Sequence, residues 1–149
     1  KEWVDSRYAE SARHLIQNGL KVLLLGTEAS PKIVECCEDI VDLGGKTDLG
    51  TAAAILARAE TVLSVDAGLL HLAAAAGTRV VGLYGPSNPE ITGPQGDGHV
   101  VISQKVDCSP CMRTECSRQR ECMDLIGTDE VISALNSILQ LPARQDCPL

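Results

Sequence analysis

The sequence predicts an α/β protein of the Rossmann-like type, a three-layer sandwich in which helices cover both faces of a parallel sheet. Short aliphatic runs alternate with segments of helical periodicity, which is typical of parallel strands joined by right-handed crossovers. One of these runs, Val22–Leu25, has no polar residue, as is typical of a strand buried on both faces. A length of 149 residues is sufficient for one such domain.

The first part of the chain predicts two helices and two strands. Apolar residues recur at helical spacing over Asp5–Asn18, and a glycine follows where that helix would end. Val22–Leu25 is an uninterrupted aliphatic run and predicts a strand buried on both faces. A helix over residues 30–38 would start with Ser30 as its cap and the next proline in its first turn. Ile40–Leu43 predicts the second strand.

The same alternation continues through the middle of the chain. Helices are predicted over Asp48–Ala59 and Leu69–Ala76, and strands over Thr61–Val65, Arg79–Tyr84 and Val100–Ser103. The segment between the last two strands holds four Gly and three Pro over residues 85–98, so it predicts a loop.

The C-terminal part predicts a cysteine-rich loop and a closing helix. The loop covers residues 105–124, and an amphipathic helix follows over Thr128–Leu139. The buried face of this helix is predicted to consist of Val131, Leu135, Ile138 and Leu139. We therefore expect one domain over residues 1–141 and a frayed tail over residues 142–149.

Composition and charge exclude several classes of protein. Hydrophobic residues make up 44% of the chain and the mean hydropathy is +0.05, as in globular proteins. The longest nearly uncharged apolar run, Leu69–Ala76, is far shorter than the roughly 18 residues of a membrane span, so a soluble protein is expected. Thirteen Lys and Arg against twenty Asp and Glu give a net charge of −7, with two Tyr, one Trp and no Phe. A nucleic-acid partner is not expected, because such proteins need basic tracks and stacking rings.

The chain start and the cysteine count bear on origin and compartment. Lys1 leads into the first predicted helix within a few residues, with no apolar signal segment before it. We therefore expect a piece of a longer protein. Seven cysteines in an acidic, enzyme-like domain do not suit a secreted disulfide scaffold, so a reducing cytoplasm is expected.

The loop after the strand Thr61–Val65 predicts an anion site, because ligands of open α/β sheets bind beyond the carboxyl ends of the strands. Gly68 permits a close approach of the backbone, and the helix that begins there offers free amides and a positive dipole end. His71, one turn into the helix, is close enough to donate to an oxyanion. The structural alternative is that Asp66 caps the helix and His71 is a satisfied core histidine.

A second candidate follows the first predicted strand. Glu28 is well placed there to accept both hydroxyl protons of a ribose. The alternative is that this carboxylate only complements the dipole of the next helix. Gly45, Lys46 and Thr47 match the end of a P-loop, but Ile40 occupies the position of its first glycine. The chain also lacks a G-x-G-x-x-G motif and a short Asp-x-Asp metal site, so no metal is expected at this edge.

Four cysteines lie within fifteen positions of the loop 105–124, namely Cys108, Cys111, Cys116 and Cys122. Four thiolates are what a tetrahedral zinc ion or an iron–sulfur cluster requires. The second pair is spaced more widely than in a double C-x2-C knuckle. Bound metal, loop-closing disulfides and free structural thiols are the three alternatives.

Several segments together resemble the C-terminal half of the family 9 glycosyltransferases, the ADP-heptose lipopolysaccharide heptosyltransferases. The strongest similarity lies in Val65–Ala73 followed by Leu83–Ser87. Lys1-x-Trp3 resembles the family's opening K-x-W, and residues 44–49 resemble its G-x-T/S-x-L stretch. Residues 108–123 are similar to the cysteine-rich segment of some members, so the resemblance covers nearly the whole chain.

The resemblance implies the donor half of an enzyme built from two Rossmann-like domains, the GT-B architecture. The acceptor-binding N-terminal half and the first strand of the donor domain would then be absent. Lys1 would contact the donor diphosphate, Glu28 the adenosine ribose, and the backbone near Thr47 the adenine.

The family's diphosphate and heptose contacts carry over to Asp66, Ala67, Gly68 and His71. Ala67 departs from the Ser or Thr common in the family, which removes one hydroxyl donor to phosphate, so only a backbone contact is expected there.

The implied reaction is inverting transfer of heptose from ADP-heptose to an acceptor on the lipopolysaccharide inner core, with no metal cofactor. The general base lies on the other half in the family, so no catalytic residue is named here and the chain alone is expected to be inactive. Peripheral contact with the inner face of the inner membrane would belong to the full-length enzyme. The alternatives are a GT-B glycosyltransferase with a different nucleotide sugar and a non-catalytic module that binds metal and a partner protein.

Overall fold

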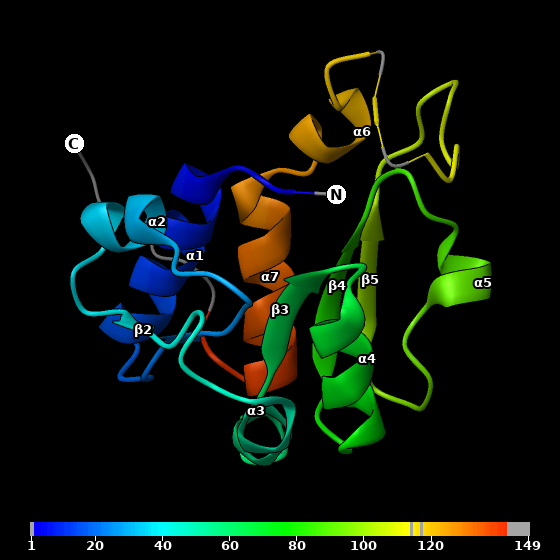
Figure 1. The fold of residues 1–149 in the computed structure, drawn as a ribbon. Helices are drawn as coiled ribbons and strands as arrows, with labels where there is room; N and C mark the ends of the chain where they lie inside the picture. The colour runs from blue at the N-terminus through cyan, green and yellow to red at the C-terminus, as the bar shows by residue number, and fades with distance from the viewer. Residues whose placement is uncertain (1, 114, 117, 143–149) are drawn as a thin grey trace.

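The computed structural model describes residues 2–113, 115–116 and 118–142 (Figure 1). Within these residues the elements follow in the order α1 (Asp5–Gln17), β1 (Leu23–Leu24), α2 (Pro31–Cys36), β2 (Val41–Asp42), α3 (Leu49–Leu56), β3 (Val62–Val65), α4 (Gly68–Ala75), β4 (Val80–Tyr84), α5 (Pro89–Thr92), β5 (Val100–Ser103), α6 (Glu121–Asp124) and α7 (Thr128–Leu139).

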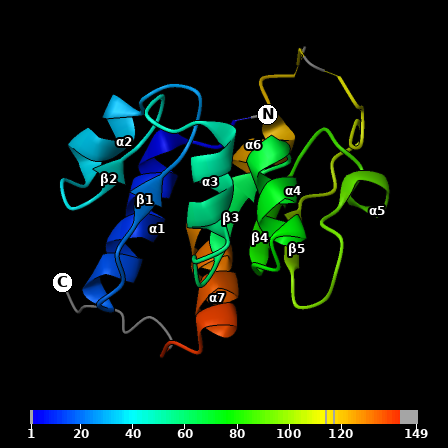
Figure 2. The same ribbon diagram turned by 60° about the horizontal axis from the view of Figure 1, so that its bottom comes forward.

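Helices cover both faces of the strands, so the chain forms three layers (Figures 1 and 2). The central strand β4 explains this arrangement, because all five of its residues are buried. Val81 and Leu83 belong to the core cluster on the α7 face, and Val80 and Tyr84 belong to the cluster on the α4 face. α1 packs against α7 and α2, whereas α3 packs against α4.

The strands form two parallel sheets where the sequence predicted one. β1 pairs with β2, and β4 pairs with both β3 and β5. Within the described residues no ladder joins β1 to β3. Leu25, directly after β1, packs against the core cluster of α3, α4 and β4, so the two sheets remain connected by packing. The expected burial of Val22–Leu25 on both faces is wrong, because none of the four residues is buried and Leu23 is 43% exposed. Within the described residues this strand pairs with β2 alone.

Predicted and observed element ends agree best at the C-terminus. β5 and α7 have the predicted ranges, and the remaining predicted helices and strands are present but shifted or shorter at one or both ends. On α7, Ile132 is buried and Leu139 is only half-buried, so the predicted buried face needs this correction. Nε2 of His14 on α1 lies 2.8 Å from Oδ1 of Asn136, a buried polar link between the two helices.

Local hydrogen bonds explain where the short helices begin. Oδ1 of Asp48 accepts from the Thr51 N–H at 2.7 Å and caps α3. Ser30 does not cap α2 through its side chain, contrary to the expectation. α5 lies inside the predicted loop 85–98; Oδ1 of Asn88 accepts from the Glu90 N–H at 3.0 Å and starts it. α6 similarly interrupts the predicted loop 105–124.

Trp3 ties the start of the chain to the turn between α6 and α7. Its side chain is 3% exposed, and its Nε1–H donates to the Ile126 carbonyl at 3.0 Å. The ring packs edge-on against Tyr8 with centroids 5.0 Å apart. No helix in the described part of the chain has the length and apolarity needed to span a membrane.

Two glycines allow the loop after β1 to touch the loop after β2. The Gly45 N–H donates to the Gly26 carbonyl at 2.9 Å, and Gly45 has a positive φ of 70°. A Cβ on Gly44 would overlap the carbonyl oxygen of Glu28, which is main chain and cannot rotate away. The close approach of these loops therefore requires glycine at position 44.

We predict that Gly44→Ala lowers the free energy of unfolding by about 1–3 kcal/mol, because the added methyl forces the loops apart. Gly50→Ala is the matched control. A Cβ at Gly50 would meet only Oδ1 of Asp48, at 3.7 Å, and alanine favours the helix. Denaturant unfolding of both variants provides the measurement, and equal stabilities would contradict the prediction.

Candidate functional site

The candidate site is the edge formed by the loops that follow the strands. Parallel pairing brings the carboxyl ends of β3, β4 and β5 to one end of their sheet. Figure 2 shows the loops after β1, β2 and β3 at the top of the molecule, where α3 and α4 also begin. Asp66 comes directly after β3, and α4 starts at Gly68 with Ala67 as its N-cap.

The start of α4 is open toward solvent. No side chain in the described residues caps this helix through a hydrogen bond, and a Cβ on Gly68 would meet nothing within 4 Å. Ala67 and Gly68 are both exposed. An eight-residue helix therefore presents its positive dipole end to empty space, which is an arrangement suited to an anion.

A polar network lies next to this helix end. Nε2 of His71 is 3.2 Å from Oδ1 of Asp66, and the hydroxyl of Thr92 lies 3.5 Å from Oδ2 of the same carboxylate. Tyr84 donates its hydroxyl proton to the Thr92 carbonyl at 2.9 Å. Burial, and to a lesser extent the Asp66 charge, raises the pKa of Tyr84 to about 12, so the phenol stays protonated at neutral pH.

This geometry contradicts the alternative that His71 is a core histidine. Asp66 is 8% exposed, and its Oδ1 lies 3.2 Å from Nε2 of His71. The His71 side chain is 44% exposed, so it is not a core histidine. Asp66 thus contacts one ring nitrogen of His71. The rest of the imidazole faces solvent beside the start of α4.

The other predicted residues lie on the two touching loops. Glu28 is exposed and Thr47 is half-buried, and their loops meet at the contact between Gly44 and the Glu28 carbonyl. The structure therefore brings the Glu28 and Thr47 segments together. Lys1 lies outside the described residues.

Asp42 is the residue that fixes these loops, and the sequence reading missed it. Its two carboxylate oxygens accept from the Gly44 N–H and from the Ser30 N–H, both at 2.8 Å. These two donors, Gly44 first, hold the pKa of Asp42 below its ordinary value. The sequence signal that could have indicated Asp42 is its position at the end of a predicted strand, two residues before a pair of glycines.

Two further groups at the edge had no clear sequence signal. Thr92 belongs to a segment predicted as loop, so its approach to Asp66 depends on the unforeseen helix α5. Ser87, in the loop after β4, is 2% exposed, and its hydroxyl has no hydrogen-bond partner within the described residues. A buried hydroxyl without a partner is costly, which makes Ser87 a candidate contact for a bound molecule or water.

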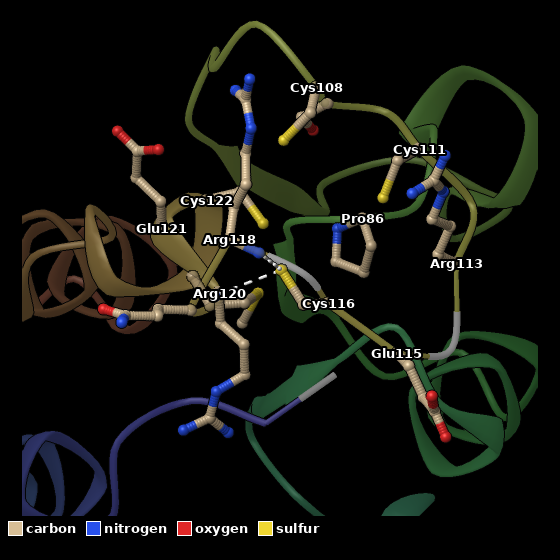
Figure 3. Close-up of a pocket in the computed structure, with 13 residues that line it drawn as sticks. Pro86, Cys108, Cys111, Arg113, Glu115, Cys116, Arg118, Arg120, Glu121 and Cys122 are labelled. Atoms are coloured by element: carbon tan, nitrogen blue, oxygen red, sulfur yellow. Dashed lines mark hydrogen bonds between the residues drawn. The ribbon is translucent and has the colours of Figure 1, made fainter.

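The four cysteines of the loop 105–124 line a cavity of about 280 Å³ beside this edge (Figure 3). All four are free thiols. The Sγ of Cys116 accepts from the N–H groups of Arg118 and Arg120, each at 3.3 Å, and these two bonds lower its pKa. Burial and then the neighbouring Cys116 raise the pKa of Cys122.

The comparison with known families decides the identity. Residues 1–121 match the family described as glycosyltransferase family 9 (heptosyltransferase). The chain belongs to this family. Among the relatives of this family 9 chain, lipooligosaccharide heptosyltransferase 2 of Haemophilus influenzae is 35% identical over 113 residues, which are 68% of this chain and 32% of that protein. Lipopolysaccharide heptosyltransferase 1 of Pseudomonas aeruginosa is 31% identical over 124 residues, or 80% of this chain and 35% of that protein.

Solved structures agree with this assignment. The Escherichia coli ADP-heptose lipopolysaccharide heptosyltransferase II superposes with a TM-score of 0.74 at 29% identity, over 94% of this chain and 42% of that one. The E. coli heptosyltransferase WaaC with ADP gives a TM-score of 0.60 at 29% identity, over 68% of this chain and 33% of that one. The predicted fold class, a Rossmann-like domain of GT-B glycosyltransferases, is confirmed. The family 9 chain spans about a third of the length of its curated relatives.

We predict that Asp42→Asn weakens the fold of this family 9 domain at neutral pH and flattens its stability on the acid side. The carboxylate of the folded protein has a lowered pKa, so its contribution is present above the unfolded pKa of about 3.9 and is lost as the pH falls through the folded pKa. Asparagine carries an NH2 group in place of one carboxylate oxygen. One of the two backbone N–H groups would then face a second donor and lose its acceptor.

Urea unfolding between about pH 6 and pH 2 provides the measurement. Asp39→Asn, at an exposed carboxylate three residues earlier, is the control and should keep the acid dependence of the parent. An identical acid dependence in Asp42→Asn and the parent would contradict the role assigned to Asp42.

Proposed function

We propose that this chain is the donor-binding domain of a heptosyltransferase and that it binds the nucleotide of ADP-heptose at the carboxyl edge of its strands. The observation that carries the proposal is the open N-terminus of α4 beside the Asp66–His71 pair. The family assignment supports the reaction class, since the relatives are named heptosyltransferases.

The start of α4 suits the diphosphate. The amides of the first turn and the helix dipole attract a phosphate oxygen without a metal ion. The methyl of Ala67 provides no hydrogen bond, so this position contributes its backbone only. His71 faces the same space and donates to the diphosphate, while Asp66 orients its ring and accepts from heptose hydroxyls. Lys1 would add a positive charge to the diphosphate.

The two touching loops suit the nucleoside. The exposed carboxylate of Glu28 accepts hydrogen bonds from the two ribose hydroxyls, and the backbone near Thr47 contacts the adenine. Leu49, at the start of α3, is 73% exposed and offers an apolar surface on which a base can pack. A structure titled as E. coli heptosyltransferase WaaC with ADP supports the choice of nucleotide.

The reaction we propose for the complete enzyme is a single displacement at the anomeric carbon, which inverts its configuration. The oxygen of an acceptor hydroxyl bonds to that carbon, the bond to ADP breaks, and ADP leaves with the electron pair. The amides at Gly68 and the imidazole of His71 stabilise the charge that develops on ADP. The hydroxyl proton goes to a general base that we assign to an N-terminal acceptor domain outside this chain.

The complete enzyme would act on an acceptor of the lipopolysaccharide inner core. That acceptor places the enzyme in the cytoplasm, with peripheral contact at the inner face of the inner membrane. Residues 1–141 would form its donor domain. The chain alone is expected to bind nucleotide without transferring heptose, and measurable transfer by the chain alone would contradict the assignment of the base to another domain.

The first test is an amide-resolved NMR titration of the chain with ADP and, as a control, with UDP. The expected result is that ADP shifts amides of residues 26–28, 45–49 and 66–71 at lower concentration than UDP does. A preference for UDP would favour the alternative of a GT-B glycosyltransferase with a different nucleotide sugar. A folded sample in which neither nucleotide moves these amides would contradict the proposal and favour a non-catalytic binding module.

We predict that Gly68→Ala weakens ADP binding about tenfold, or ~1.4 kcal/mol, without loss of stability. The added methyl would meet no other part of the described chain within 4 Å, and it points to where the diphosphate is expected. Gly127→Ala is the matched control, because Gly127 also stands at the start of a helix with nothing within 4 Å. Calorimetric titration with ADP provides the measurement, and equal affinities in the two variants would exclude the diphosphate from the start of α4.

A further inference from the structure

We propose that the thiols of Cys108, Cys111, Cys116 and Cys122 bind one zinc ion as a structural tetrathiolate site. This site is separate from the nucleotide edge, and the proposal holds whether or not the chain binds ADP. Zinc in structural sites takes four ligands in a tetrahedron, and cysteine thiolates are its commonest ligands there.

The four sulfurs converge from three separate stretches of the chain. Figure 3 shows the Cys108 and Cys111 side chains entering the cavity from one side, with Cys116 and Cys122 pointing toward them from the other. Four of the six cysteines that the structure describes therefore gather at one place.

Backbone contacts hold two of these stretches in place. The Ser109 hydroxyl donates to the Gly85 carbonyl, and the Met112 N–H donates to the Pro86 carbonyl at 2.7 Å. The turn that carries Cys108 and Cys111 is thus attached to the end of β4. On the other side, Cys122 is 7% exposed and packs on Gly85.

The main chain around Cys116 is arranged for a charged sulfur. Two N–H groups, from Arg118 and Arg120, donate to its Sγ at 3.3 Å each. Such pairs of amide donors suit an anionic sulfur better than a neutral thiol, which is a weak acceptor. The left-handed backbone of Gln119 and Arg120 turns these amides toward the sulfur.

Closure of the site requires a small movement. In the described residues no group of three or more His, Cys, Asp or Glu side chains stands at metal-binding spacing. Cys108, Cys111 and Cys116 lie outside helices and strands, so rotation of their side chains toward the ion would not disrupt a helix or strand, while Cys122 lies on α6.

Zinc binding would place a negatively charged complex in the cavity. Zn²⁺ displaces one proton from each of the four thiols, and the resulting complex carries a net charge of −2. Arg113, Arg118 and Arg120 are among the residues that line the cavity, as are Glu115 and Glu121. The guanidinium group of Arg120 turns away from the thiols (Figure 3), and its Nη1 lies 3.5 Å from Oε2 of Glu2.

The test begins with the zinc content of the chain purified under reducing conditions, measured by elemental analysis and native mass spectrometry. The expected result is one zinc per chain, released by a thiol-modifying reagent. Cobalt substitution should give the thiolate charge-transfer and visible absorption of a tetrahedral sulfur site. Failure of the chain to take up zinc would overturn the proposal. A mass that shows these four cysteines joined in two disulfides under the same conditions would also overturn it.

Two serine variants distinguish the site from adventitious binding. Cys116→Ser, at an exposed position, is expected to lower zinc affinity by at least roughly tenfold, whereas Cys36→Ser, at an exposed cysteine of α2, should leave it unchanged. Far-ultraviolet circular dichroism confirms that both variants fold. Equal zinc affinity in the two variants would overturn the assignment. ADP titration of the same samples reports separately on the nucleotide site.

Discussion

The parallel pairing of β4 with β3 and β5 is the constraint on which the rest of the structure depends. Every residue of β4 is buried, with alternate side chains in the core clusters of the two helical layers. The register Val65↔Leu83 and Tyr84↔Ser103 then determines where each strand ends. Asp66 and Gly85 follow directly, so the polar network and the cysteine cavity are both consequences of this one sheet.

The polar edge works because a buried carboxylate there has defined partners. A carboxylate as buried as Asp66 would be unfavourable without hydrogen-bond donors, and His71 and Thr92 both lie close to it. The same contacts determine how charge is distributed at this edge of the sheet. The negative charge stays behind the imidazole, and the helix amides face outward. In the proposed complex, a diphosphate would meet these donors first, and sugar hydroxyls would reach the carboxylate.

Sequence patterns predicted the parts of the fold that depend on local burial. The aliphatic run of β4 and the apolar face of α7 have their own periodicity, so their ranges came close to the observed ones. The separation of β1 from β3 could not be predicted, since strand pairing is a long-range property. The helix α5 was hidden by the high Gly and Pro content around it, although Asn88 and Pro89 are good helix starters.

The candidate site was predictable to a similar degree. Asp66, Gly68 and His71 were predicted as one group because a strand end, a glycine and a helix start coincide in a few residues, and the structure places Asp66 3.2 Å from His71. Asp42 was missed because its role depends on hydrogen bonds that it accepts from two N–H groups in different loops, one of them twelve residues away. The convergence of the four thiols is likewise a property of the folded loop, and the spacing alone left metal, disulfides and free thiols open.

The loop after β4 links the two functional regions. Gly85 packs closely against α6, since a Cβ there would meet Sδ of Met123 at 2.5 Å and Sγ of Cys122 at 2.9 Å and would force these side chains to shift. One residue further, the Pro86 carbonyl accepts from Met112, and Ser87 places its unpartnered hydroxyl in the same loop. Any change that tightens the cysteine loop therefore acts on the segment that leads to Thr92 and Asp66. A structural ion at the thiols would stabilise the loop that leads to Thr92 and Asp66, and with it the edge at which we propose that the nucleotide binds.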